Sequence, residues 1–418
     1  MEKELFRTII AENQEYIGRI PLVQRPLDLE EYGNYVFVGV RQAGKSYLLY
    51  QRIQQLLANG VDIEDIVYIN FDDERLQGMS VTDFDLILQA YHSMYDSQPI
   101  FFFDEIQNVE GWANFARRLA NQKYRVYITG SNAKMLSRDI ETVLGGRYLD
   151  ISVFPYSFSE YLKAVEVLLS KNWQYGRKAN ELQRHFRTYF DWGGFPELVH
   201  FQEKRIWLNS LYNRIFFNDL VVRHKIKNED ALRLCVRRLA ESVKQPCSLN
   251  RLSNLIKATG TPCSPSTVME YVRYLQESCL LISIDNYVSK FVEKETIKKH
   301  YFVDNGLLHL FINNPNTSLL ENLCAITLYK KYAKGLYYYN KNIEVDFYVP
   351  DEGLAVQASY QMSDGETIER EVKALVALHG LHPLKRAMII TYEDEGEIVR
   401  DGLRIEIKPA WKWVLEGL

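Results

Sequence analysis

The chain has 418 residues but only five cysteines, and no two of them form a CxxC pair. An odd number of dispersed cysteines supports neither a disulfide framework nor a zinc site. Free or buried thiols are typical of a reducing compartment, so we expect a cytoplasmic protein. The cysteines are Cys235, Cys247, Cys263, Cys279 and Cys324.

Long hydrophobic runs and a strong net charge are also missing. No run of about 18 apolar residues occurs, the length that a membrane span requires, and the first residues do not have the pattern of a signal peptide. The formal net charge is only −4, so any nucleic-acid contact must come from a local basic patch. The chain is 47% hydrophobic, and its length indicates about two to four domains.

The segment Gly39-Val-Arg-Gln-Ala-Gly44-Lys45-Ser46 has the pattern GxxxxGK[ST], with an apolar strand before it and a helical pattern after it. Glycines allow the backbone N–H groups to face phosphate oxygens, and the helix amino end favours the same anion. We expect Lys45 to reach the β- and γ-phosphates of ATP and the Ser46 hydroxyl to bind Mg²⁺. The expected nucleotide contacts are Gly39, Gln42, Ala43, Gly44, Lys45, Ser46 and Tyr47.

An acidic pair follows a second apolar strand, in Ile100-Phe-Phe-Phe-Asp104-Glu105. In parallel sheets, ligands bind beyond the carboxyl ends of the strands. Asp104 is therefore predicted to hold Mg²⁺, and Glu105 to polarise the attacking water, as a hydrolase requires. Together with the glycine-rich loop, this pair indicates an ATPase.

Other polar residues are weaker candidates for the same site. Ser131 and Asn132 end the next strand and are candidate sensors of the γ-phosphate, although a helix N-cap is an alternative role. Arg147 is a candidate arginine finger, with a surface arginine as the alternative. Asp72 and Asp73 follow the second strand, where a solvated loop is at least as good an interpretation.

The first 155 residues alternate between strand and helix patterns, which predicts a parallel, doubly wound α/β sheet. Thr82 and Asp85 resemble a helix capping box. The expected strands are 35–38, 66–69, 100–103, 125–129 and 148–152, and the expected helices are 46–57, 82–95 and 112–121.

The pattern changes after Pro155. A helix-rich aromatic segment is broken at Gly193-Gly194 and Pro196, and three short helices and a hairpin follow, in the order of a winged helix. Strands and helices then alternate again, with strands expected at 301–303, 336–339, 345–349, 354–358 and 387–391. The predicted division is a P-loop ATPase domain (1–155), a helical lid or linker (156–228), a winged helix (229–292) and a second α/β domain (293–418).

With these residues in hand, the chain resembles the prokaryotic AAA-like ATPases that join a P-loop domain to a C-terminal region of uncharacterised function. The resemblance is carried by GVRQAGKS, FFFDEIQ, ITGSNA, GGR, FPYSFSEYL, YFDWGGFPE, NDLVVRH, YFVDNGL, EN and EVDF. It implies an AAA-like ATPase with a helical lid, a winged helix and a C-terminal domain similar to PD-(D/E)XK nucleases.

The same resemblance places the acids of a nuclease site at Glu321 and Asp346. The next strand should carry an acid and a lysine, but Gln357 and Ser359 stand there. Gln is a poor Mg²⁺ ligand and Ser carries no positive charge. We therefore expect a degenerate nuclease-like domain without nuclease activity. If a catalytic group has moved to the neighbouring helix, the candidates are Glu369, Arg370 and Lys373.

Three functions remain open: an ATP-driven switch or machine acting on a macromolecule, an ATP-regulated DNA-binding protein, and an ATP-dependent nuclease. A small-molecule kinase fits Glu105 and the added domains poorly.

The presumed recognition helix, 266–280, has Arg273 against two glutamates, which favours a protein partner slightly over DNA. The following segment, 287–300, carries four lysines against two glutamates; it could touch a nucleic-acid backbone, but we favour a solvated charged face. A homo-oligomer is compatible with each function. The lysines are Lys290, Lys294, Lys298 and Lys299.

Overall fold

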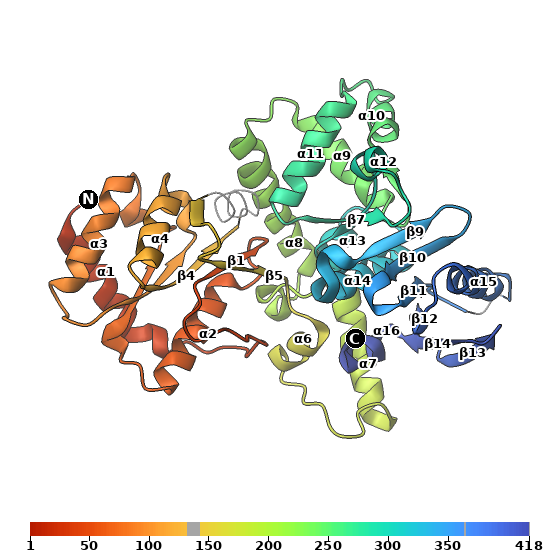
Figure 1. Cartoon of the computed structure of the whole chain (residues 1–418), viewed down its shortest axis with the longest axis horizontal. Coiled ribbons are helices and arrows are strands. Elements are labelled where there is room, and N and C mark those ends of the chain that lie inside the picture. The colour runs from red at the N-terminus through yellow and green to blue at the C-terminus, as the bar shows by residue number, and fades with distance from the viewer. Residues whose placement is uncertain (132–142, 363–364, 418) are drawn as a thin grey trace. The chain divides into compact units, whose positions relative to one another are not determined.

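The computed structural model describes residues 1–131, 143–362 and 365–417. The chain divides into two compact units, residues 1–154 with 277–279 and residues 155–276 with 280–418. Figure 1 colours the first unit from red to yellow and most of the second from yellow-green to blue. Each unit has its own sheet.

The first unit is built on a sheet of five parallel strands in the order β2-β3-β4-β1-β5. Every residue of β1 and β3 is buried, as expected for a parallel sheet that helices cover on both faces. The carboxyl ends of β1, β3 and β4 meet at one edge, and this edge positions the candidate site. The strands are β1 (Tyr35–Gly39), β2 (Ile66–Asn70), β3 (Ile100–Asp104), β4 (Arg125–Gly130) and β5 (Leu149–Val153).

Helices lie on both faces of this sheet (Figure 1). Alternate residues of each strand point to opposite faces. Phe101 and Phe103 belong to a buried cluster that includes side chains of α1, α3 and α4. Phe102 faces the other way and stacks on Tyr127 at 4.7 Å between ring centroids, and Arg52 of α2 donates to the Tyr127 hydroxyl at 3.1 Å. The sheet therefore has apolar packing on both faces. The helices are α1 (Lys3–Tyr16), α2 (Lys45–Ala58), α3 (Phe84–His92) and α4 (Trp112–Asn121).

The capping box before α3 lies two residues earlier than predicted. The backbone N–H and the hydroxyl of Ser80 both donate to Asp83 Oδ2 at 2.8 Å. The prediction at Thr82 and Asp85 is wrong because Asp85 forms an ion pair with Arg118 of α4 instead. The capping residues lie in a short 3₁₀ turn that leads into the α-helix.

The second unit contains a mixed sheet in the order β13-β14-β12-β11-β10-β9-β7-β8-β6. Strand β7 joins its two parts, because it pairs antiparallel with β8 and parallel with β9. The sheet therefore continues through the predicted division between residues 292 and 293. The strands are β6 (Cys247–Ser248), β7 (Leu281–Asn286), β8 (Ile297–Phe302), β9 (Tyr337–Asn340), β10 (Glu344–Val349), β11 (Leu354–Ala358), β12 (Arg386–Thr391), β13 (Gly396–Arg400) and β14 (Leu403–Pro409).

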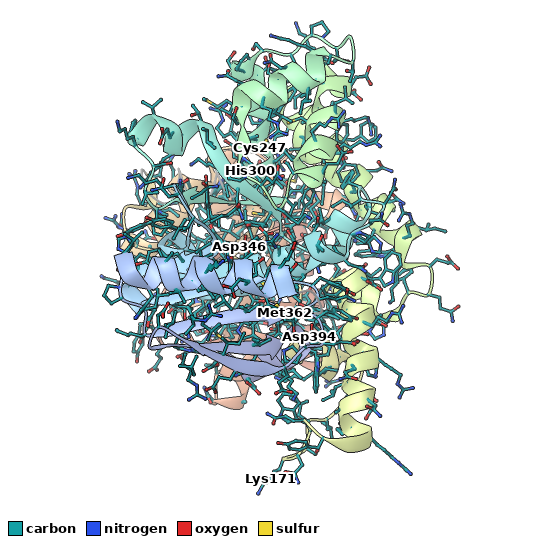
Figure 2. All side chains as sticks on the ribbon, turned by 90° about the vertical axis from the view of Figure 1, so that its right-hand side faces the viewer. Lys171, Cys247, His300, Asp346, Met362 and Asp394 are labelled. Carbon is teal, nitrogen blue, oxygen red and sulfur yellow. The ribbon has the colours of Figure 1, made fainter. Side chains whose placement is uncertain are left out.

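Helix α15 packs on one face of this sheet, where Leu375 and Leu378 join a buried cluster with Ile389 and Ile405. Figure 2 shows α15 with Asp346 beside it. Among the described residues, no helix combines the length and the apolar character that crossing a bilayer requires. The helices are α6 (Phe158–Ala164), α7 (Gly176–Trp192), α8 (Lys204–Arg214), α9 (Glu229–Glu241), α10 (Leu249–Lys257), α11 (Pro265–Glu277), α12 (Phe291–Thr296), α13 (Asn305–His309), α14 (Asn316–Tyr332), α15 (Gly365–Leu381) and α16 (Ala410–Glu416), and a π-helix spans Ile215–Val222.

The glycine turn after α7 is held by a buried aspartate from a distant part of the chain. Asp304 accepts hydrogen bonds from the backbone N–H groups of Gly194 and Gly306, both at 2.8 Å. Gly193 has φ 78°, and a Cβ there would lie 1.9 Å from the Asp304 carboxylate. Only glycine fits this position, so the WGGFP and VDNGL segments form one structural joint.

Candidate functional site

The glycine-rich loop connects β1 to α2 at the carboxyl edge of the five-stranded sheet. Gly44 has φ 91° and Gln42 has φ 60°, so the loop makes two left-handed turns before α2 begins at Lys45. Gly39 passes so close to β5 that a Cβ on it would lie 2.1 Å from the Val153 carbonyl oxygen. The loop glycines therefore serve both the turn and the sheet contact.

Lys45 points back into the loop. Its Nζ donates to the carbonyl oxygens of Gly39 and Val40, each at 3.1 Å, and lies 3.4 Å from Glu105 Oε1. The side chain is 4% exposed. The ammonium group thus lies inside the loop that the sequence predicted to cradle phosphate.

Asp104 ends β3 beside this loop. Its Oδ2 accepts a hydrogen bond from the Tyr68 hydroxyl at 2.8 Å, and its carboxylate also accepts from the hydroxyls of Thr129 and Ser46. Burial raises the pKa of Asp104, and the negative charge of Glu105 raises it further. The Ser46 hydroxyl and the Asp104 carboxylate are oxygen donors of the kind that Mg²⁺ prefers, so this pair fits the predicted metal.

Glu105 adopts a left-handed backbone with φ 50°, which directs it toward Lys45. Its N–H donates to Thr129 Oγ1 at 2.9 Å, and its Oε2 accepts from Gln107 Nε2 at 2.5 Å. Burial alone would raise the pKa of Glu105, but Lys45 and the Gln107 hydrogen bond outweigh it and lower the pKa. Glu105 is therefore held as a carboxylate, the form that a general base requires.

Gln107, Thr129 and Tyr68 were missed by the sequence analysis. Gln107 also approaches Ser131 at 3.5 Å, so the candidate sensor Ser131 belongs to the same network as Glu105. The signal for Thr129 was available, since it is the penultimate residue of β4, the strand next to β3 in the sheet. The other sensor candidate, Asn132, lies outside the described residues.

The remaining nucleotide candidates are at the loop and the start of α2. Ala43 N–H donates to the Val40 carbonyl at 3.3 Å, which closes the loop turn. Tyr47 is 53% exposed, with its ring edge-on to Tyr50 at 5.5 Å. In contrast, Asp73 caps a 3₁₀ turn and pairs with Arg75 at 2.8 Å, which agrees with the loop interpretation of that acidic pair.

Arg147 lies at the opposite edge of the sheet from the glycine-rich loop. It precedes Leu149, which pairs with Tyr35 at the start of β1, whereas the loop follows the end of β1. A strand of this length spans about 13 Å. The exposed Arg147 donates to Asn121 Oδ1 at 2.6 Å. Arg147 is therefore not one of the residues that surround the nucleotide loop of its own chain, and its role as an arginine finger stays a prediction.

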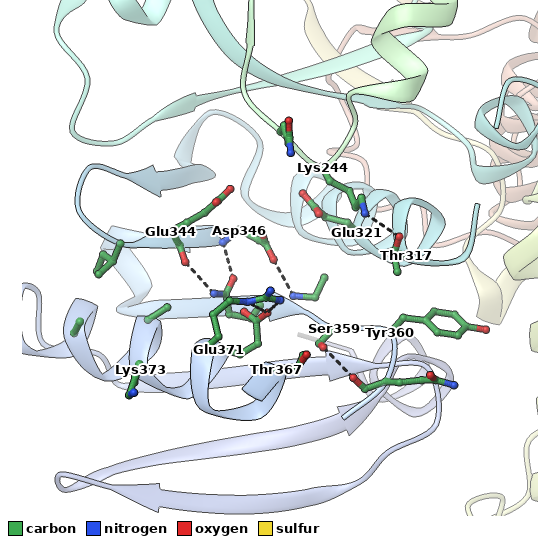
Figure 3. A pocket seen from close by; sticks show the side chains of 18 residues that line it. Lys244, Thr317, Glu321, Glu344, Asp346, Ser359, Tyr360, Thr367, Glu371 and Lys373 are labelled. Atoms are coloured by element: carbon green, nitrogen blue, oxygen red, sulfur yellow. Dashed lines mark hydrogen bonds and ion pairs between the residues drawn. The ribbon is translucent and has the colours of Figure 1, made fainter. Parts of the chain in front are cut away.

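The second unit has a separate pocket of 840 Å³ formed by α14, α15, β10 and β11 (Figure 3). Glu321 of α14 and Asp346 of β10 both contribute to it, as the resemblance implied. Between them lies Lys299 Nζ, 3.1 Å from Glu321 Oε1 and 2.9 Å from Asp346 Oδ1. Lys299 was expected in a solvated charged segment, but its side chain is 0% exposed, so that expectation is wrong for this lysine.

Gln357 is held by the backbone of the neighbouring strand. Its amide oxygen accepts from Asp346 N–H at 2.8 Å, and its amide nitrogen donates to the Glu344 carbonyl at 3.0 Å. A carboxylate at this position could make the first hydrogen bond but not the second. Ser359 donates to the Gln361 carbonyl at 3.3 Å. The two positions where a nuclease would carry an acid and a lysine thus have neutral side chains that bind backbone groups.

The three candidates for a migrated catalytic group lie on α15. Glu369 pairs with Lys373 at 3.4 Å and with Arg400 at 3.2 Å, while Arg370 pairs with the buried Glu371 at 2.5 Å. Arg370 and Lys373 line the pocket, but Glu369 does not number among the lining residues. The charged groups of this helix are therefore engaged with one another or with β13.

Comparisons with known proteins place this geometry in context. The family described as "AAA domain" matches residues 32–162, and the family described as "Domain of unknown function (DUF8612)" matches residues 183–318. The uncharacterized protein MJ1544 of Methanocaldococcus jannaschii is 31% identical, over 99% of this chain and 96% of that protein. An uncharacterized protein of Haemophilus influenzae is 30% identical, over 91% of this chain and 94% of its own length.

Among solved structures, the Walker-type ATPase paby2304 of Pyrococcus abyssi is similar with a TM-score of 0.42 at 12% identity, covering 74% of this chain and 95% of that one. The family match over the first unit agrees with its parallel five-stranded sheet and its glycine-rich loop. The chain therefore belongs, with its relatives in M. jannaschii and H. influenzae, to a family of AAA-like P-loop ATPases whose C-terminal region is uncharacterised.

Proposed function

We propose that this protein binds Mg·ATP at the glycine-rich loop and hydrolyses it slowly, and that it uses the nucleotide state to act on a macromolecular partner. The observation that carries the proposal is the meeting of Lys45, Ser46, Asp104 and Glu105 at one edge of a parallel sheet. Few other chemistries use a lysine in a glycine loop beside a carboxylate pair.

The role of each residue follows from its contacts. Lys45 exchanges its carbonyl and Glu105 partners for the β- and γ-phosphates of ATP. Ser46 and Asp104 would hold Mg²⁺, which would neutralise charge on the phosphates. Glu105, released from Lys45 and oriented by Gln107, would accept a proton from the water whose oxygen bonds to the γ-phosphorus. The bond from that phosphorus to the β–γ bridging oxygen breaks, and ADP and phosphate leave.

Glu105→Gln tests the hydrolytic step. The variant keeps the size of the side chain but loses the base, so we expect ATP binding to persist while turnover falls by about 10²–10⁴-fold. Binding is measured by calorimetry and turnover by phosphate release. An unchanged rate would show that another group activates the water.

For the second unit, we propose a winged helix followed by a PD-(D/E)XK nuclease-like domain. The order α9, α10, α11 and the β7–β8 hairpin supports the first part. The series α14, β9, β10, β11, α15 and β12, with acids on α14 and β10, supports the second. The neutral contacts of Gln357 and Ser359 support the absence of nuclease activity.

A protein partner is favoured over DNA by the segment between β7 and β8. Phe291 and Val292 of α12 are 78% and 71% exposed there, and in the following strand β8 Lys298 is paired with Asp285 at 3.0 Å. Exposed apolar side chains suit a protein surface better than a phosphate backbone. The alternatives are an ATP-regulated DNA-binding protein and an ATP-dependent nuclease.

Two assays separate these alternatives. ATPase rates are measured with the protein alone and with added DNA, RNA or cell extract. Stimulation by DNA would favour the ATP-regulated DNA-binding protein and the ATP-dependent nuclease. Supercoiled and linear DNA are incubated with Mg²⁺ or Mn²⁺, with and without ATP. Cleavage that Asp346→Ala removes would contradict the proposal that the nuclease-like domain is inactive.

A further inference from the structure

The pocket of the second unit contains the acids of a metal site. The cluster around Lys299 nevertheless makes this pocket unlike a metal site. We propose that Lys299 is a resident cation, which fills the place between Glu321 and Asp346 where a nuclease-like site would bind a divalent metal, so that this pocket takes its ligands without metal. The inference concerns the second unit alone and stands whether or not the first unit hydrolyses ATP.

The first support is that three carboxylates surround the ammonium, two at hydrogen-bond distance and one farther away. Lys299 Nζ lies 3.1 Å from Glu321 Oε1, 2.9 Å from Asp346 Oδ1 and 3.6 Å from Glu344 Oε1. It also lies 5.8 Å from the centre of the Tyr338 ring, within the range of a cation–π contact. A compact cation at the centre of three carboxylates has the position of a bound metal ion.

The second support is that the same two acids also accept other hydrogen bonds. Tyr301 donates to Glu321 Oε1 at 2.9 Å, and the Ala358 N–H donates to Asp346 Oδ2 at 3.1 Å. Mg²⁺ requires about six oxygen ligands in near-octahedral geometry. A metal entering here would have to displace the ammonium and these hydrogen bonds together, while Gln357 offers no carboxylate in return.

The third support is that Lys299 cannot easily leave. It lies within β8, where successive side chains point to opposite faces. Its neighbours Lys298 and His300 contact Asp285 and Ser283. Its side chain is 0% exposed, so moving its ammonium away from the acids would disturb the packing around it. A catalytic lysine that assists a metal-bound water would instead stand beside the metal and leave the space between the acids open.

The test measures metal binding by the full-length, nucleotide-free protein carrying Asp104→Asn, which removes the acid proposed to hold Mg²⁺ at the nucleotide loop. Mn²⁺ is the probe, and free Mn²⁺ is followed by electron paramagnetic resonance. With Lys299 present, we expect no site that depends on Asp346. With Lys299→Met, we expect one Mn²⁺ site with a dissociation constant of about 0.1–1 mM, typical of sites with few carboxylates.

Adding Asp346→Asn to Lys299→Met should abolish that site, and Lys298→Met is the matched control that should gain none. The proposal is overturned if the protein with Lys299 binds Mn²⁺ and Asp346→Asn removes the binding. It is also overturned if folded Lys299→Met gains no site. If Lys299→Met does not fold, the protein with Lys299 decides: Asp346-dependent Mn²⁺ binding overturns the proposal, and its absence supports it.

Discussion

The two units each place a lysine among carboxylates, with different consequences. Lys45 begins a helix after a glycine loop and contacts two carbonyls and one acid, at 3.4 Å. Lys299 lies within a strand and contacts two acids at 3.1 Å or less. Phosphate oxygens can replace the weak partners of Lys45, whereas Lys299 is already paired with two buried-site carboxylates. A lysine that follows a glycine loop can thus bind a ligand, whereas a lysine within a paired strand has a structural role.

Lys45→Ala is expected to have the largest effect, because it removes the only one of the two lysines that can meet phosphate. ATP binding measured by calorimetry should disappear. The comparison also requires that Lys299→Met leaves ATP affinity unchanged. Undiminished affinity in Lys45→Ala, or a parallel loss in Lys299→Met, would break the distinction between the two sites.

Arg147→Ala asks whether the nucleotide site is completed by a second copy of the chain. Because Arg147 lies away from its own loop, it can act as a finger only on a neighbouring molecule, where such a charge is worth about 10³–10⁵ in rate. We expect Arg147→Ala and Lys45→Ala to be inactive alone and to regain activity when mixed. A full rate in Arg147→Ala alone would exclude the finger.

Gly193→Ala tests the surroundings of Asp304, a buried acid that accepts its hydrogen bonds from backbone N–H groups. The added methyl group meets the Asp304 carboxylate, and the alanine must adopt the left-handed backbone that Gly193 has at φ 78°. Destabilisation should be at least about 3 kcal/mol by denaturant unfolding. Gly335→Ala is the control, since its Cβ would meet nothing within 4 Å. Equal stability of the two variants would show that the joint tolerates movement.

The pH dependence of Asp304 should be a smaller effect. Burial raises its pKa from 3.8 to about 6, although hydrogen bonds from Gly194 and Gly306 oppose the rise. Because the pKa of Asp304 is higher in the folded state, its protonation stabilises the fold fully below the unfolded pKa. This stabilisation is lost as the pH rises through about 6. Relative to Asp304→Asn, the wild type should lose up to about 3 kcal/mol between pH 4 and pH 7 in unfolding experiments. A constant difference would refute the shift.

The first unit was largely predictable from the sequence because its signals are local. A strand, a glycine loop and a helix follow one another at Gly39–Ser46, and α4 has the predicted bounds 112–121. The carboxyl ends of parallel strands meet by necessity, so Asp104 could be placed beside the loop. The distance of Arg147 from its own loop could not be predicted, since the amino end of β5 looks no different in sequence from the carboxyl end.

The second unit was less predictable because its site depends on pairing between distant segments. Lys299 lies in Lys298-Lys299-His300, which reads as a charged surface strand, and nothing local links it to residues 321 and 346. Strands β13 and β14 and helix α16 were not anticipated. The exposed pattern of β13 lacks the alternation that marks a half-buried strand.

The continuity of the second sheet has a practical consequence for dividing the protein into fragments. A fragment that ends at residue 292 would carry β7 without β8, and the complementary fragment would carry β8 without β7. Each would expose an unpaired strand edge, a template for association with other chains. The second fragment would also keep Lys299 on a strand that has lost its neighbour on the β7 side. Expression of either piece should therefore yield aggregates, whereas residues 155–418 keep the hairpin intact.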